Sequence, residues 1–148
     1  SLRDIDILAE QLVAELLTAD LPVGLEEDLA ERERAARAAQ ARQLLDTRVR
    51  IAATLGDPEA PQRAESLAEE FARAGEFPDA AYAFWLLGSL HPEGTDAVYA
   101  LESAKEGFEM ARLSGPRREV GEELVALLKR LGRTDEAEKL AVELSGNA

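Results

Sequence analysis

The chain of 148 residues contains no cysteine, which excludes disulfide bonds and thiolate metal sites. Its single histidine, His91, excludes a metal site built on a pair of histidines. No apolar run approaches the roughly 18 residues that a membrane-spanning helix needs. The N-terminus lacks the basic and then apolar pattern of a signal peptide, so we expect a cytoplasmic protein.

Motifs that carry chemistry are missing as well. Neither G-x-x-x-x-G-K nor G-x-G-x-x-G occurs, so the sequence shows no glycine-rich phosphate loop. The acidic cluster at 26–28 lacks the loop pattern of a calcium site, and in the first turn of a helix these acids complement the helix dipole. We therefore predict no catalytic residue, no metal, no cofactor and no enzymatic activity.

Basic residues are too few to balance the acids, and the net charge is −13. This charge opposes binding to nucleic acid or to an anionic membrane, and it favours a basic partner or serves solubility alone. Six arginines do gather in one stretch, but acids at 31, 33 and 46 interleave with them and indicate a salt-bridged, solvated helix. These arginines are Arg32, Arg34, Arg37, Arg42, Arg48 and Arg50.

Six glycines divide the chain, and from residue 56 onward their spacing is nearly constant. They are Gly24, Gly56, Gly75, Gly94, Gly115 and Gly132. The four steps from Gly56 to Gly132 are 19, 19, 21 and 17 residues long. Glycine accepts the left-handed conformation just past a helix end, so this spacing predicts a stack of antiparallel helices.

Apolar residues at helical spacing predict seven helices, and no segment alternates with the period of a strand. The expected helices are 2–20, 25–55, 59–74, 78–90, 95–113, 116–131 and 134–144. The segment 25–55 reads as one long helix or as two helices end to end. We expect an all-α fold with an N-terminal long-helix hairpin at 1–56 and a repeat region at 57–148, in one continuous domain.

Residues 61–92 resemble a tetratricopeptide repeat (TPR), a helix–turn–helix unit of about 34 residues. The matching residues are Leu67, Ala68, Phe71, Gly75, Ala80, Phe84 and Pro92. Residues 118–146 resemble a second copy through Leu124, Leu128, Gly132 and Ala137, while Val125 and Ala141 depart from the pattern. The resemblance implies a TPR-like α-solenoid, an antiparallel stack of helical hairpins.

The two matches do not fall at a whole number of repeats. Gly75 and Gly132 are 57 residues apart, whereas TPR turns are separated by multiples of about 34 residues. The difference corresponds to one additional helix, 95–113. Either this helix is an insertion, or one match is out of phase with the other.

The TPR resemblance implies a protein-interaction module with a peptide groove. Its groove positions are Gln62, Glu65, Glu69 and Arg73 in the first copy and Glu119, Glu122, Ala126, Lys129 and Arg130 in the second. The only asparagine is Asn147, so a chaperone-type carboxylate clamp is not expected. The acids among these positions favour a basic or apolar peptide, and a merely solvated acidic face is the alternative. These acids are Glu65, Glu69, Glu119 and Glu122.

All seven aromatic residues lie between 71 and 108. Tyr82 and Trp85 are three residues apart and share a helix face. With Tyr99 they form a candidate anchor for a partner, since Trp and Tyr are enriched in interface hot spots. The alternative is that Trp85 fills a gap between helices. The predicted partner-binding residues are therefore Tyr82, Trp85, Tyr99, Glu65, Glu69 and Glu122.

The sequence thus predicts a non-catalytic protein–protein interaction module for a peptide or protein partner. The alternative is a sensory or regulatory helical domain of a larger transcriptional regulator, which the absent initiator Met fits. We also expect self-association as a homodimer through residues 2–55. The stretch 26–43 is rich in alanine, and alanine faces permit close helix pairing within a chain or between two copies.

Overall fold

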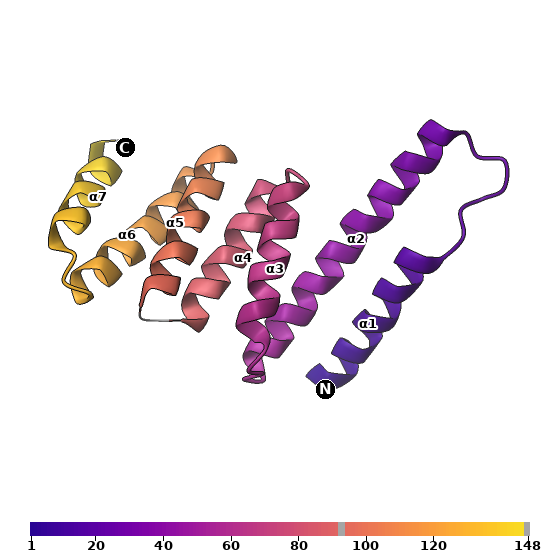
Figure 1. Cartoon of the computed structure of the whole chain (residues 1–148), viewed down its shortest axis with the longest axis horizontal. Coiled ribbons are helices and arrows are strands. Elements are labelled where there is room, and N and C mark those ends of the chain that lie inside the picture. Colours follow the sequence, from indigo (N-terminus) through magenta and orange to yellow (C-terminus); the bar gives the residue numbers. More distant parts are fainter. Residues whose placement is uncertain (92–93, 147–148) are drawn as a thin grey trace. The chain divides into compact units, whose positions relative to one another are not determined.

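The computed structural model describes residues 1–91 and 94–146, and over these residues it contains seven α-helices and no strand (Figure 1). The helices are α1 (Leu2–Thr18), α2 (Glu27–Thr54), α3 (Ala60–Arg73), α4 (Phe77–Leu90), α5 (Thr95–Met110), α6 (Ser114–Arg130) and α7 (Thr134–Gly146). The predicted all-α, TPR-like series of helices is confirmed, and 25–55 forms one helix. Pro92 and Asn147, which the sequence argument used, lie outside the described residues.

The chain divides into two compact units, Ser1–Ala60 and Pro61–Ala148. The first contains the hairpin of α1 and α2, and the second contains the shorter helices that follow. No helix in the described part of the chain is long and apolar enough to cross a membrane.

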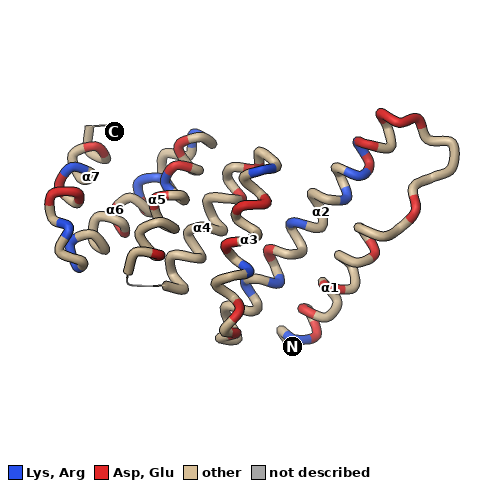
Figure 2. The backbone as a smooth tube through the Cα atoms, viewed as in Figure 1, with Lys and Arg blue, Asp and Glu red and all other residues tan. Residues whose placement is uncertain are grey.

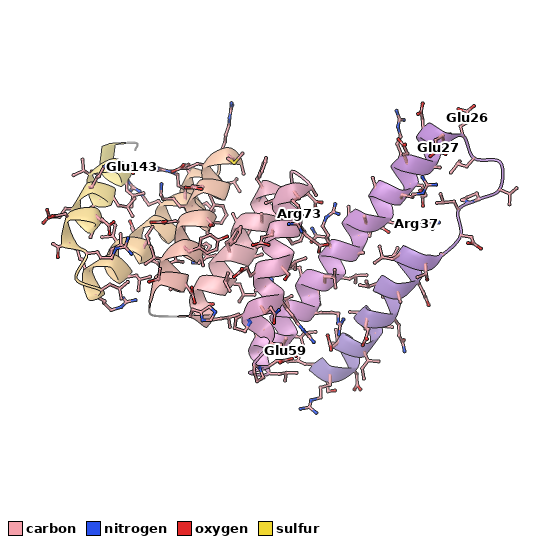
Figure 3. All side chains as sticks on the ribbon, viewed as in Figure 1. Glu26, Glu27, Arg37, Glu59, Arg73 and Glu143 are labelled. Carbon is pink, nitrogen blue, oxygen red and sulfur yellow. The ribbon has the colours of Figure 1, made fainter. Side chains whose placement is uncertain are left out.

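In the first unit, α1 and α2 pack against each other as an antiparallel hairpin. Arg48 Nε donates to Asp6 Oδ1 at 2.8 Å near one end of the pair. Arg37 of α2 donates from Nη1 to the carbonyl oxygen of Ala19 at 2.7 Å near the other end (Figure 3). α1 buries Ala9 alone, so little of its large apolar surface is covered by α2. Arginines and acids interleave along α2, as expected (Figure 2).

In the second unit, tight turns end the helices at the left-handed residues Gly75, Arg112 and Gly132. At each turn the amide one residue further on donates to a carbonyl near the helix end, as Arg133 N does to Leu128 O at 2.8 Å. The prediction that Gly115 ends a helix is wrong, because Gly115 lies in the first turn of α6. Arg112 makes that turn instead, with φ of 59°, although it is not a glycine.

The core of the second unit forms where α4 packs on α5, α5 on α6, and α6 on α7. Its largest fully buried side chains are Phe71, Phe108, Val120, Leu124 and Leu127. Glycines inside the helices lie at close crossings, since a Cβ on Gly88 would meet Leu101 at 2.7 Å and a Cβ on Gly121 would meet Leu144 at the same distance. Ala80, matched to a small TPR position, is buried.

Candidate functional site

Polar contacts show how the helices of the second unit alternate. Trp85 Nε1 on α4 donates to Glu123 Oε2 on α6 at 2.8 Å. Lys105 Nζ on α5 donates to Glu143 Oε1 on α7 at 3.3 Å. Each contact skips one helix in the sequence, so α4 lies beside α6 in one layer and α5 lies beside α7 in the other.

Two interpretations of the 57-residue spacing between Gly75 and Gly132 were possible: an inserted helix, or two repeat matches that are out of phase. The alternation of the helices distinguishes between them. The match over 61–92 makes α4 the second helix of a repeat, whereas the match over 118–146 makes α6 a first helix. Because α4 and α6 lie in the same layer, one match is out of phase with the other. The helix α5 takes a regular place in the alternation and is not an insertion.

Tyr82 and Trp85, two of the predicted anchor residues, lie together on α4. Their rings stack with centroids 6.2 Å apart, and both meet the buried ring of Phe108 edge to face, at 4.9 Å for Tyr82 and 5.7 Å for Trp85. Tyr82 is exposed and Trp85 is partly buried. Trp85 thus contributes to packing between α4 and α5 while its indole N–H reaches α6.

The other predicted site residues lie elsewhere in the second unit. Tyr99 on α5 is exposed and packs edge to face on Phe84, with centroids 5.9 Å apart, apart from the Tyr82–Trp85 pair. Glu65 and Glu69 are on α3, where Glu65 is exposed and Glu69 is partly buried. Glu122 lies on α6 in a groove beside α7. The structure therefore does not gather the six residues at one place.

A hollow of about 280 Å³ opens where α6 faces the adjoining parts of α4 and α5. Its lining includes the apolar residues Leu101 and Leu127 and two side chains of opposite charge, Glu123 and Arg130. Glu123 is the residue that accepts the hydrogen bond from Trp85. The aromatic pair and the hollow are therefore linked through one side chain that the sequence analysis did not identify.

A second groove, of about 460 Å³, lies between α6 and α7. Its lining residues are Arg118, Glu122, Val125, Ala126, Lys129, Ala141, Leu144 and Ser145. Ala126 also lines the hollow beside α4, so the two depressions meet on the exposed face of α6. Three residues of this groove, Glu122, Ala126 and Lys129, are groove positions that the TPR resemblance implied for α6.

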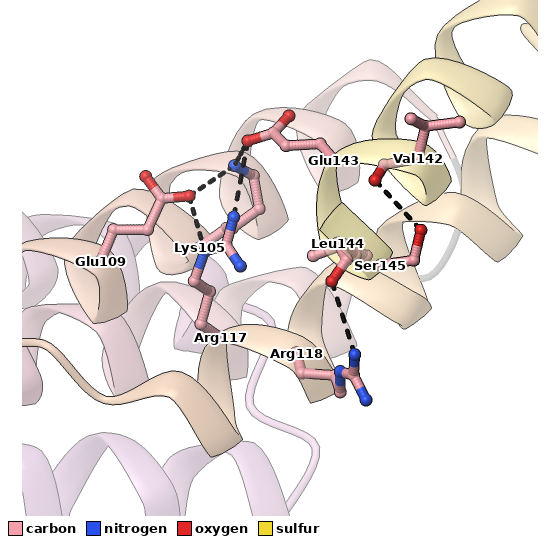
Figure 4. Close-up of polar contacts among 8 residues, drawn as sticks. All are labelled: Lys105, Glu109, Arg117, Arg118, Val142, Glu143, Leu144 and Ser145. Atoms are coloured by element: carbon pink, nitrogen blue, oxygen red, sulfur yellow. Dashed lines mark hydrogen bonds and ion pairs between the residues drawn. The ribbon is translucent and has the colours of Figure 1, made fainter. Parts of the chain in front are cut away.

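Four charged side chains from α5, α6 and α7 form a network (Figure 4). Lys105 Nζ donates to Glu109 Oε1 at 2.8 Å, and Arg117 Nε donates to the same oxygen at 2.9 Å. Arg117 Nη2 also lies 3.5 Å from Glu143 Oε1. The network ties α5, α6 and α7 together.

Electrostatics in this network favour the ionised forms. Burial opposes the charge on Lys105, but its hydrogen bonds and charge interactions with Glu109 and Glu143 outweigh burial and raise the pKa of its ammonium group. Burial likewise opposes the charge on Glu109, but Lys105 and Arg117 outweigh it and lower the pKa of this carboxyl group. Each group stabilises the charged state of its neighbour, which indicates a structural ion-pair network.

Within the part of the chain that the structure describes, no three His, Cys, Asp or Glu side chains gather in a way that could hold a metal ion. The arrangement that the structure does offer is a surface of aromatic, apolar and charged side chains on α4, α6 and α7. Such a surface suits contact with another macromolecule.

Known proteins add little to this description. No protein-family model and no curated protein matches the chain. Two crystal structures of nearly identical TPR-like repeats from a kinesin light chain of Podosopora anserina, one of them a single-substitution variant, each align at 16% identity with a TM-score of 0.41. The alignments cover 98% of this chain and 86% and 85% of those chains. At this identity and TM-score, the likeness carries no inference about partner or function.

Proposed function

We propose that this chain is a non-catalytic interaction module that binds a peptide segment of a protein partner on the face shared by α4 and α6. The observation that supports the proposal is the hydrogen bond from Trp85 to Glu123, because Glu123 also lines the hollow beside α6. Aromatic side chains beside an apolar depression are the usual anchors of protein interfaces.

Charge defines the partner further. Glu122 and Glu123 are both exposed on α6, and the chain carries a net charge of −13. A peptide with Lys or Arg beside apolar residues would pair with these acids and place apolar side chains in the hollow. We propose Tyr82, Trp85, Glu122 and Glu123 as the residues that contact it.

Selection from a randomised peptide library displayed on phage tests this proposal. We expect selected peptides to be rich in basic and apolar residues and to bind Trp85→Ala and Glu123→Gln at least about tenfold more weakly, a loss of roughly 1.4 kcal/mol or more. Tyr99→Ala is the matched control, because Tyr99 is also an exposed aromatic residue but packs on Phe84 away from the pair. Peptides that bind all three folded variants equally well would contradict the proposed site.

We also propose a second copy of the chain as a protein partner. We propose that the α1–α2 hairpin takes part in self-association, since α1 exposes the aliphatic residues Leu2, Ile5, Ile7, Leu8, Leu12 and Leu17. Sedimentation velocity over a range of concentrations measures this association directly. A single species with the monomer mass at every concentration would contradict it.

A further inference from the structure

One face of α1 is an uncovered aliphatic stripe. Ile5, Leu8 and Leu12 follow one another at helical spacing and are 50%, 55% and 39% exposed. The last helix, α7, differs, because Val142 is its only large apolar residue that is exposed among those described. An exposed aliphatic stripe of this kind marks a candidate contact surface for another protein.

Polar residues border the stripe in a defined order. Asp4, Gln11 and Glu15 lie along one edge of the stripe, because steps of seven and four residues return to the same side of a helix. From the N-terminus, this edge therefore carries an acid, a neutral amide and a second acid. All three side chains are exposed.

The groove between α6 and α7 carries the complementary order. The apolar residues that line it include the partly buried Val125, the exposed Ala141 and the buried Leu144. Its rim on α6 is formed by Arg118, Glu122 and Lys129, at steps of four and seven residues. From the N-terminus of α6, this rim therefore carries a cation, an acid and a second cation. All three residues are exposed.

The two spacings match when the helices run antiparallel. Glu15 then lies opposite Arg118, Gln11 opposite Glu122, and Asp4 opposite Lys129, with about 16 Å between the outer pairs on each helix. In this register both acids meet cations, and the acid on the rim meets a neutral amide. The aliphatic stripe lies over the apolar residues of the groove at the same time.

We propose that α1 of one copy of this chain docks antiparallel into the α6–α7 groove of another copy. The inference rests on the proposed role of the chain as a protein-interaction module and names one partner and its surface. The contact is heterologous, so it leaves one free α1 and one free groove on every pair and allows head-to-tail growth. The small contact and the net charge of −13 keep the association weak and dependent on concentration.

The absence of cysteine makes a direct test possible, since introduced cysteines can form disulfides only with each other. A Leu8→Cys protein is mixed with an Ala141→Cys protein under mild oxidation, because Ala141 is exposed and lines this groove but not the hollow beside α4. We expect the mixed disulfide to form at least about tenfold faster than with Ile7→Cys in place of Leu8→Cys, a difference of about 1.4 kcal/mol. Ile7 is the matched control because it is 53% exposed but lies on another side of α1.

Charge reversal tests the register. Glu15→Lys and Arg118→Glu should each weaken association severalfold, measured by sedimentation velocity, and the double variant should restore it. Glu15→Lys combined with Lys129→Glu should not restore it, because residue 129 pairs with Asp4 in the antiparallel register. Restoration by Lys129→Glu, in place of Arg118→Glu, would overturn the proposed orientation.

Three outcomes would overturn the proposal: a monomer at every concentration, a mixed disulfide no faster than the Ile7→Cys control, or a preference for disulfides between two Leu8→Cys chains. The last result would mean that α1 pairs with another α1. Glu123→Gln introduced into both proteins separates this proposal from the peptide site, because Glu123 does not line the α6–α7 groove. It should weaken peptide binding at least about tenfold and leave the mixed disulfide unchanged.

Discussion

Gly107 of α5 lies so close to α4 that a Cβ atom on it would be 2.9 Å from the Cβ of Ala81. The same Cβ would lie 3.3 Å from the Cα of Ala81 and 3.4 Å from the carbonyl oxygen of Phe77. These neighbours are backbone atoms or are fixed directly to the backbone, so no side-chain rotation can make room. The absence of a side chain at 107 therefore sets how closely α4 and α5 approach each other.

We expect Gly107→Ala to destabilise the protein by about 1–3 kcal/mol, because overpacking a close helix crossing shifts the backbone. The helix preference of alanine over glycine, up to ~1 kcal/mol, is not sufficient to offset this cost. Urea denaturation followed by circular dichroism measures the change. Gly115→Ala is the matched control, since nothing lies within 4 Å of its Cβ position, and it should be neutral or stabilising.

The turn between α5 and α6 contains the only non-glycine residue with positive φ among those described, Arg112 at 59°. A left-handed conformation costs roughly 1–2 kcal/mol for a residue with a side chain. Arg112→Gly removes this strain but makes the unfolded chain more flexible, so we expect a net stabilisation of about 0.5–1 kcal/mol. An unchanged or lower melting temperature would mean that the arginine side chain contributes more than the strain costs.

Replacing the glycine of the next turn, Gly132, by a residue with a side chain should lower the stability of the protein. Gly132 has φ of 78° and nothing lies within 4 Å of its Cβ position, so Gly132→Ala adds strain without a clash. We expect a destabilisation of about 1 kcal/mol. Thermal denaturation of the two variants, measured side by side, separates backbone strain from side-chain contacts.

The carboxyl group of Glu109 should make stability depend on acid pH. Its pKa is lowered in the folded state, so its contribution is present above the unfolded pKa, about 4.3, and is lost as the pH falls through the folded pKa. Because its side chain is 37% exposed, solvent screens the interaction and Glu109→Gln should cost no more than about 1 kcal/mol at neutral pH. The stabilities of the two proteins should converge in acid.

The exposed acid Glu138 provides the control for this comparison. Glu138→Gln should change the free energy of unfolding little at any pH, since it removes the same charge outside the network. The free energies of unfolding of Glu109→Gln and the parent protein are then compared from neutral to acid pH. A difference that stays constant would show that ionisation of Glu109 does not contribute to stability.

Trp85 has a packing role and a polar role that two substitutions can separate. Trp85→Phe keeps an aromatic ring near Tyr82 and Phe108 but loses the hydrogen bond to Glu123, and we expect a cost of about 0.5–1.5 kcal/mol. Trp85→Ala also loses the ring contacts and should cost about 3 kcal/mol or more. Calorimetric melting of both variants measures the difference. Equal melting temperatures would mean that the ring contributes no packing energy.

The seven helices could be predicted from sequence because local signals specify them. Glycine at 56, 75 and 132 marks turns by its own conformational freedom, and the apolar periodicity of each segment gives its buried face. Arg112 shows where such signals fail, since a strained turn there is enforced by the packing of α5 against α6 and carries no glycine. The phase of the repeats was likewise undetermined, because it depends on which helices meet across layers.

The candidate site was only partly predictable for a similar reason. Tyr82 and Trp85 could be paired in advance, because residues three positions apart on one helix lie on the same face. Tyr99 was grouped with this pair in advance but packs on Phe84 instead, and Glu123 was not identified at all, since the neighbours of both residues come from other helices. Glu123 lies 38 positions from Trp85, and no periodicity within α6 marks it as the partner of an indole.

In the second unit, α4 packs on α5, α5 on α6, and α6 on α7, so these neighbours in space are neighbours in sequence. A chain of this kind closes only short loops as it folds, and low contact order is associated with fast folding. Folding can begin at any adjacent pair and spread to the next helix. Amide hydrogen exchange should therefore be slower in α5 and α6, each of which packs against two helices, than in α7, which packs against one.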